Sequence, residues 1–225
     1  NKTIEYKKYS SNLFKMFSPN YNRDNFNEIS NKILNQTVLV VANKKFRICE
    51  IEMYLNSETH PDTYTHSHKD QQSFGKFYFH KYSNNAYKSG TWKGLDIVLG
   101  DKSKYFGILI RSMVELDSDG KEILNEFIEG PCRCVNKILE QFDSNNVSEL
   151  FAKQFPNQTQ IDFETNPQFK LEFANNLGFE EIYEGPRIGL SDKYPEYMNK
   201  NYRYAIFTKK IKKNSKTFVK SQQTL

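Results

Sequence analysis

The sequence predicts an α+β fold, a single domain with a curved, mostly antiparallel β-sheet flanked by helices. Short runs rich in β-branched and aromatic residues alternate with turn signals, and two segments place apolar residues at helical spacing. The chain has 225 residues, of which 37% are hydrophobic and 26% charged. This length and composition are typical of one globular domain with a core rich in Phe and Tyr rings.

We divide the chain into a polar N-terminal arm (1–24), an α+β domain (25–208) and a basic C-terminal tail (209–225). The first predicted helix, 26–36, places Phe26, Ile29, Ile33 and Leu34 on one face. The predicted strands, each apolar or alternating and bounded by turn residues, are 37–42, 46–55, 76–82, 91–100, 105–116, 185–191 and 202–207.

Two helices follow the central strands. Residues 130–142 begin with Gly-Pro, a helix-opening signal, and continue with an amphipathic pattern. Residues 148–155 predict a short helix, whereas 156–180 carry no clear pattern.

Composition also bears on the cellular compartment of the protein. No apolar run is long enough to cross a membrane, and the first residues lack the apolar core of a signal peptide. Three cysteines cannot all pair, and Cys132 and Cys134 are too close for a CxxC motif. We therefore expect reduced thiols in an intracellular protein, in the nucleus or mitochondrion if the source is eukaryotic.

The net charge is +5, and six lysines lie between Lys209 and Lys220 without an acid. Such a block is typical of a solvated tail, and binding of a polyanion is the alternative.

The predicted strand 46–55 carries two acids. Because side chains alternate, Glu50, Glu52 and Tyr54 share one face with Ile48, and the opposite face is apolar. Either a solvated edge or an acid at the floor of a cleft would explain the pattern.

Polar residues also interrupt two other apolar strands. Asp96 lies in "GLDIVLG" and Arg111 in "GILIRSM". A buried Arg needs a partner, so Arg111 is either in a structural ion pair with an acid such as Glu50 or Asp96, or positions an anion or water in a cleft. The convergence of Glu52, Asp96 and Arg111 indicates a site.

All four histidines lie between His60 and His80. Three interpretations stay open: hydrogen-bonded histidines without catalytic duty, a catalytic His paired with a carboxylate, or a metal site. The sequence contains no HExxH pattern, and we expect neither a metal nor a cofactor.

The ordered series "EIEMY", "THSH", "GKFYFH", "GLDIVLG", "GILIRSM", "GPCRCVNKIL", "GPRIGLS" and "YRYAIF" resembles the alkyladenine (3-methyladenine, or methylpurine) DNA glycosylases over roughly residues 30–208. The resemblance implies a methylpurine-glycosylase-like fold. It also implies that Glu52 activates the attacking water, that His66 and Arg111 hold this water, and that Tyr54 stacks on the extruded base. The context "THS" selects His66, and His60 is its rival.

The resemblance also places His80 at a second stacking position and Asp96 where the family has an Asn that screens the purine edge. The family inserts an aromatic wedge from a hairpin tip, and here the longer tip "YSNNAYKSG" offers Tyr82 and Tyr87. A carboxylate only accepts hydrogen bonds, so Asp96 would favour a base with an exocyclic amine, or would pair with Arg111.

The resemblance therefore implies a monofunctional DNA glycosylase of base excision repair, which flips a modified base out of the duplex and hydrolyses its N-glycosidic bond. We expect DNA as the partner and a monomer that does not bind membranes. The alternatives are a catalytically retired protein of this fold, acting as a nucleic-acid-binding or structural subunit of a larger assembly, and an unrelated hydrolase with a metal or His–acid pair.

Overall fold

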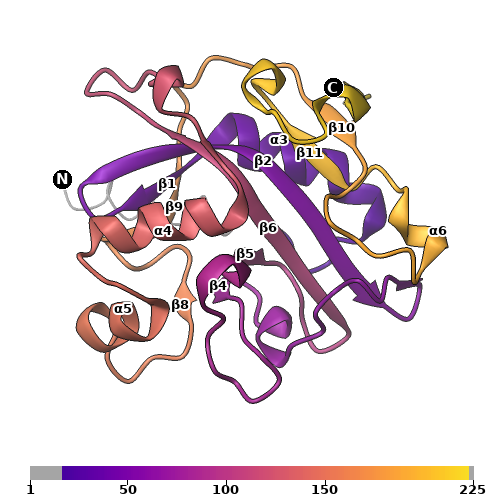
Figure 1. Cartoon of the computed structure of the whole chain (residues 1–225), viewed down its shortest axis with the longest axis horizontal. Coiled ribbons are helices and arrows are strands. Elements are labelled where there is room, and N and C mark those ends of the chain that lie inside the picture. The colour runs from indigo at the N-terminus through magenta and orange to yellow at the C-terminus, as the bar shows by residue number, and fades with distance from the viewer. Residues whose placement is uncertain (1–16, 223–225) are drawn as a thin grey trace, which may run out of the picture.

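The computed structural model describes residues 17–222, and most of the predicted N-terminal arm therefore lies outside the described residues. The described strands form one sheet in which neighbouring strands pair antiparallel (Figure 1). Two helices, Phe26–Gln36 and Pro131–Gln141, pack on it, and the molecule is a single α+β domain with an open, antiparallel sheet, which confirms the predicted class.

The main path of the sheet is β12-β10-β11-β2-β6-β5-β4-β8, and β1, β3, β7 and β9 branch from it. The strands are β1 (Thr37–Val41), β2 (Lys44–Ser57), β3 (His60–Pro61), β4 (Lys76–Phe79), β5 (Leu95–Val98), β6 (Lys104–Glu115), β7 (Ile128–Glu129), β8 (Ile161–Asp162), β9 (Phe169–Phe173), β10 (Tyr183–Gly185), β11 (Arg203–Ala205) and β12 (Val219–Lys220).

The α-helices are α3 (Phe26–Gln36), α4 (Pro131–Gln141), α5 (Val147–Gln154) and α6 (Pro195–Met198). Short 3₁₀ turns complete the chain: η1 (Arg23–Asn25), η2 (Lys69–Gln72), η3 (Gly90–Trp92), η4 (Leu124–Glu126), η5 (Thr208–Lys210) and η6 (Ser215–Thr217).

Strands β2 and β6 are the long neighbours that cross the centre of the molecule (Figure 1). Their register shifts on either side of Glu50, so that Cys49 on β2 and Arg111 on β6 have no directly opposed residue. Such bulges re-aim neighbouring side chains, and here they bring Glu50 opposite Ser112 and Glu52 opposite Leu109.

The predicted helices 26–36 and 130–142 correspond to α3 and α4. Helix α4 begins at Pro131, after Gly130 with a φ of 111°, a left-handed conformation that favours glycine. Its apolar residues, among them Val135 and Ile138, are buried in the same core as Ile29 and Ile33 of α3.

Three regions differ from the sequence prediction. The predicted strand 91–100 is a strand only over Leu95–Val98, because Gly90–Trp92 form a 3₁₀ turn. The predicted strand 185–191 is a loop after Gly185, since Pro186 cannot donate a ladder hydrogen bond and Arg187 turns inward. Residues 156–180, which carried no clear pattern, contain β8 and β9, and β9 pairs with β1.

The lysine-rich segment that we interpreted as a tail packs on the domain as far as it is described. Ile211 is 3% exposed, and β12 pairs with β10. No helix among the described residues has both the length and the apolar character needed to cross a membrane.

Candidate active site

Strand β2 places Glu50, Glu52 and Tyr54 on one face, as alternation predicts. The solvated-edge interpretation is wrong, because both acids are completely buried. They lie in the middle of the sheet, between β11 and β6, where each needs polar partners.

Glu52 is held by three donors from three parts of the chain. Tyr54 Oη donates to Oε2 at 2.7 Å, while the backbone N–H of Ile188 donates to Oε1 at 2.9 Å. Arg111 Nη1 lies 3.2 Å from the same Oε1. Burial, and then the charge of Glu52, raise the pKa of Tyr54 well above its ordinary value, which keeps this hydroxyl protonated as a donor.

Glu50 has a different set of contacts. Ser112 Oγ donates to Oε1 at 2.7 Å, Arg203 Nη1 donates to Oε2 at 3.1 Å, and Arg111 Nε lies 3.6 Å away. Burial raises the pKa of Glu50, while Arg111 opposes that rise. Glu50 therefore holds two arginines in place, and Arg111 spans both acids.

A pocket of about 210 Å³ opens next to Tyr54, and we call it the aromatic pocket. Its rings are Tyr54, Tyr64, His66 and His80; its polar groups are Gln71 and Asp96; Leu109, Ile188, Gly189 and Leu190 complete it. It is smaller than a typical drug-sized site.

Asp96 lines this pocket and is 1% exposed. His80 Nε2 lies 2.7 Å from Oδ1, and Gln71 Nε2 donates to Oδ2 at 3.0 Å. A Cβ on Gly107 would lie 2.2 Å from Oδ2, so only glycine leaves room for this carboxylate. Asp96 pairs with His80 rather than with Arg111, and the pocket stays open.

The structure separates the two candidate histidines. His60 is buried in the core, where its ring nitrogens lie 2.8 Å from Leu55 O and from Tyr202 Oη. His66 lines the aromatic pocket, 4.6 Å from His80 between ring centroids. Desolvation by surrounding protein atoms, and then His80, lower the pKa of His66 to about 4, although the residue is exposed.

A second hollow, of about 940 Å³, adjoins the pocket, and we call it the basic cleft. Arg111, Arg133, Lys212 and Lys213 line it, with Glu129 as the acid among its lining residues. Ile188 and Gly189 line both hollows. The backbone N–H of Ile188 reaches Glu52, and the carboxylate therefore lies directly behind the wall that pocket and cleft share.

Tyr82 and Tyr87, the two aromatic residues of the predicted hairpin tip, differ in their surroundings. Tyr82 is 42% exposed, whereas Tyr87 stacks on Phe151 with ring centroids 5.1 Å apart. Trp92, which the sequence reasoning did not select, is 71% exposed. It follows Thr91, a residue of the basic cleft, and precedes Gly94, which lies against the His80 ring.

Sequence reasoning also missed Arg187. This completely buried guanidinium donates to Asp62 Oδ2 at 2.6 Å and to Met53 O at 3.0 Å, and it lies 4.6 Å from the centroid of the Tyr54 ring. These contacts hold the loop after Gly185 in the position that brings the Ile188 backbone N–H to Glu52. The motif "GPRIGLS", with an arginine in an apolar context, was the available signal.

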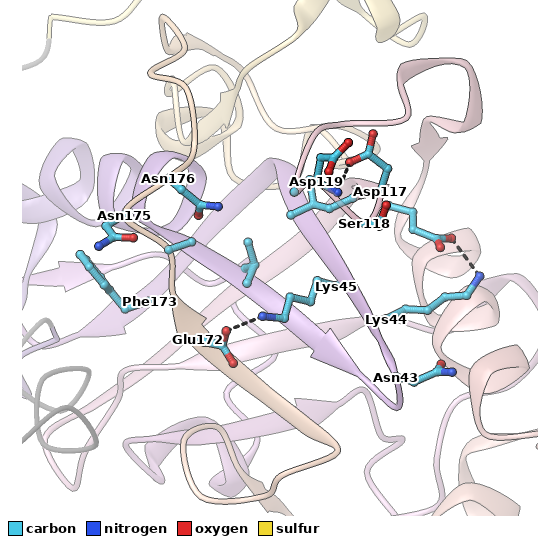
Figure 2. A pocket seen from close by; sticks show the side chains of 15 residues that line it. Asn43, Lys44, Lys45, Asp117, Ser118, Asp119, Glu172, Phe173, Asn175 and Asn176 are labelled. Carbon is cyan, nitrogen blue, oxygen red and sulfur yellow. Dashed lines mark hydrogen bonds and ion pairs between the residues drawn. The ribbon is translucent and has the colours of Figure 1, made fainter. Parts of the chain in front are cut away.

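A further hollow lies at the β1–β2 hairpin, away from these residues (Figure 2). Its lysines are paired: Lys44 with Glu115 at 3.0 Å and Lys45 with Glu172 at 2.7 Å. Across residues 17–222, no three His, Cys, Asp or Glu side chains are grouped so that they could hold a metal ion.

The sequence was compared with known proteins. It is 43% identical over 210 residues to "Uncharacterized protein L759" of Acanthamoeba polyphaga mimivirus, an alignment that covers 87% of this chain and 92% of that protein. No protein-family model matches the chain.

Proposed function

This chain belongs to the same family as uncharacterized protein L759 of Acanthamoeba polyphaga mimivirus, and we propose that it is a monofunctional DNA glycosylase. In this proposal the enzyme extrudes a modified base into the aromatic pocket and hydrolyses its N-glycosidic bond with a water activated by Glu52. The resemblance of the ordered motifs to the alkyladenine DNA glycosylases supports the same reading.

One observation carries the proposal: an aromatic pocket and a basic cleft meet over a buried carboxylate. A flipped nucleotide needs a slot for its base and a cationic surface for its backbone, with the sugar between them. The shared wall at Ile188 and Gly189 lies at that junction. The sugar would therefore lie next to Glu52, whose contacts come from both sides.

The residue types suit the reaction. As the bond between C1′ and the base nitrogen breaks, the base leaves with the electron pair and positive charge grows on the sugar. An ionised Glu52 stabilises that charge and accepts a proton from the water that adds to C1′. Arg111 contacts both Glu50 and Glu52 and so holds a positive charge beside the proposed reacting carboxylate.

The pocket also offers features for recognising a base. The Tyr54 and His80 rings provide flat faces for stacking. Asp96 has lone pairs beyond those used by His80 and Gln71, and a carboxylate accepts from an exocyclic amine. We therefore propose a base that carries such an amine.

A second candidate function has its own supporting observation. Glu52 is 0% exposed, and protein donors already bind both of its oxygens. A water reaches it only if one donor moves. A protein that binds an extruded base without hydrolysing it, as a nucleic-acid-binding subunit of a larger assembly, would keep this arrangement unchanged.

The test is base release from a panel of modified-base duplexes by the wild type and by Glu52→Gln. We expect the wild type to release at least one base and the variant to lose at least about a hundredfold in rate, because general-base catalysis contributes 10²–10⁴-fold. The exposed Glu58, just beyond β2, provides the matched control Glu58→Gln, which should keep full activity.

Duplex binding by each variant separates the outcomes. Loss of release with binding retained supports the glycosylase. Equal release by Glu52→Gln would overturn the assigned role of Glu52. Binding of the panel without any release by the wild type would favour the second candidate.

A further inference from the structure

The lysine-rich segment after β11 is held in place by contacts inside the domain. Ile211 is buried, and the backbone N–H groups of Lys212 and Lys213 donate to the two carboxylate oxygens of Glu129 at 2.8 and 3.0 Å. The sequence pattern alone suggested a solvated tail, whereas these contacts fix where the lysines emerge.

A buried arginine holds the same segment from beneath. Arg203 donates to the carbonyls of Lys213 and Asn214 at 3.2 and 2.9 Å, and to Thr217 Oγ1 at 2.9 Å. Nη1 of this guanidinium, which donates to the Lys213 carbonyl, also donates to Glu50 Oε2 at 3.1 Å. The segment is thus tied to the same network that positions Arg111.

As a result, Lys212 and Lys213 line the basic cleft together with Arg111 and with Arg133 of α4. Both lysines and Arg133 are exposed, and they make no ion pair among the described residues. Glu129, the acid of this cleft, already accepts the two backbone N–H groups. The cleft therefore presents several uncompensated cations beside the wall that covers Glu52.

We infer that Lys212 and Lys213, together with Arg133 in the same cleft, form a clamp for the sugar–phosphate backbone of DNA on the cleft side of the site. The inference rests on the proposed function for the identity of the polyanion. Lysine and arginine neutralise phosphates without reading sequence, so the clamp would position the strand while the aromatic pocket selects the base.

The test uses unmodified duplex DNA, which makes binding independent of base release. Lys212→Gln/Lys213→Gln is compared with Lys209→Gln/Lys210→Gln, which removes the same charge from exposed lysines of the same segment outside the cleft. The affinity of each protein is measured by fluorescence anisotropy of a labelled duplex across a salt series.

If both lysines contact phosphates, the slope of log affinity against log salt falls by about 1.8, and affinity at about 0.1 M salt falls at least about tenfold. Arg133→Gln should lower the slope by about a further 0.9. The Lys209→Gln/Lys210→Gln protein should keep the wild-type slope within about 0.5.

Equal slopes for the two double variants would overturn the clamp and indicate only a general charge effect. Absence of duplex binding by the wild type would also overturn it. A lower salt slope for the Lys212→Gln/Lys213→Gln protein, without base release by the wild type, would support the clamp and count against hydrolysis. The two proposals can therefore fail separately.

Discussion

At the scale of single residues, Glu50 and Glu52 show how neighbouring acids on one strand acquire different tasks. Glu50 contacts two arginines and a serine, and these contacts hold the side chains of neighbouring strands together. Glu52 is bound by Tyr54 of the aromatic pocket, Arg111 of the basic cleft and the backbone between them. Of the two carboxylates, Glu52 contacts residues of both the aromatic pocket and the basic cleft, and it is the one that we propose meets the substrate.

His66 provides a prediction about pH. Its pKa in the folded protein, about 4, lies below the ordinary value of 6.5, so protons bind the unfolded chain more tightly. The stability that neutral His66 contributes is therefore complete above about pH 6.5 and is lost as the pH falls toward 4. Because His66 is exposed, solvent screens the effect, and we expect a loss of about 1 kcal/mol.

The measurement is urea unfolding between pH 7 and pH 4 for the wild type, His66→Gln and His68→Gln. The His66→Gln protein should lose less stability on acidification than the other two. The same decline in all three proteins would show that His66 does not titrate in this way.

At the scale of elements, the bulged β2–β6 pair and the loop after Gly185 build the site, and the segment after β11 completes the basic cleft. The bulges bring Glu50 opposite Ser112, next to Arg111. The loop delivers Ile188 to Glu52 because Arg187 is anchored on Asp62. These irregular pieces, rather than the regular ladders, supply most of the contacts to Glu52.

Truncation tests whether the lysine-rich segment is an element of the fold. A chain ending at Ile211 would leave Arg203 without its carbonyl acceptors. We expect the free energy of unfolding to fall by about 1–3 kcal/mol, since a buried charged donor would lose its partners. Removing a solvated tail would change it by less than about 0.5 kcal/mol.

Urea unfolding of the truncated chain measures this difference. The control replaces Lys213 and Lys216 by Gln, which removes exposed charge while keeping the backbone. A truncated protein as stable as the wild type would show that the segment contributes nothing to folding.

At the scale of the whole molecule, the chain places the pocket, the cleft and exposed aromatic side chains close together. Residues 90–94, which begin with η3, join them, because Thr91 lines the cleft and Gly94 lies against His80. Cys132 Sγ of α4 donates to Gly90 O at 3.1 Å, which ties η3 to the helix. Trp92 emerges from this segment.

Trp92 is the single tryptophan of the chain, and its fluorescence therefore reports on this place alone. If duplex DNA docks over the pocket and cleft, Trp92 meets the bases or the backbone, and its emission should fall by at least about a third, because stacking on bases is favourable. The Trp92→Phe variant supplies the background signal. Unchanged emission at saturating duplex, with binding confirmed by anisotropy, would place the DNA elsewhere.

Much of this fold was predictable from local patterns. The amphipathic repeat gave α3, Gly-Pro marked the start of α4, and alternation put Glu50, Glu52 and Tyr54 on one face. His66 rather than His60 was chosen from its local context, and the structure places His66 in the pocket. Strands β8 and β9 were missed because β9 is specified by its partner β1 rather than by its own pattern.

The sequence by itself determined the α+β class, the central strands and which polar residues lie among apolar neighbours, because these properties depend on periodicity within a few residues. Only the tertiary structure decided which charges meet. Arg111 joins Glu50 and Glu52, Asp96 joins His80, and the lysine-rich segment becomes a wall of the cleft. Buried charges must find partners, and those partners lie far away in the chain, where no local pattern can specify them.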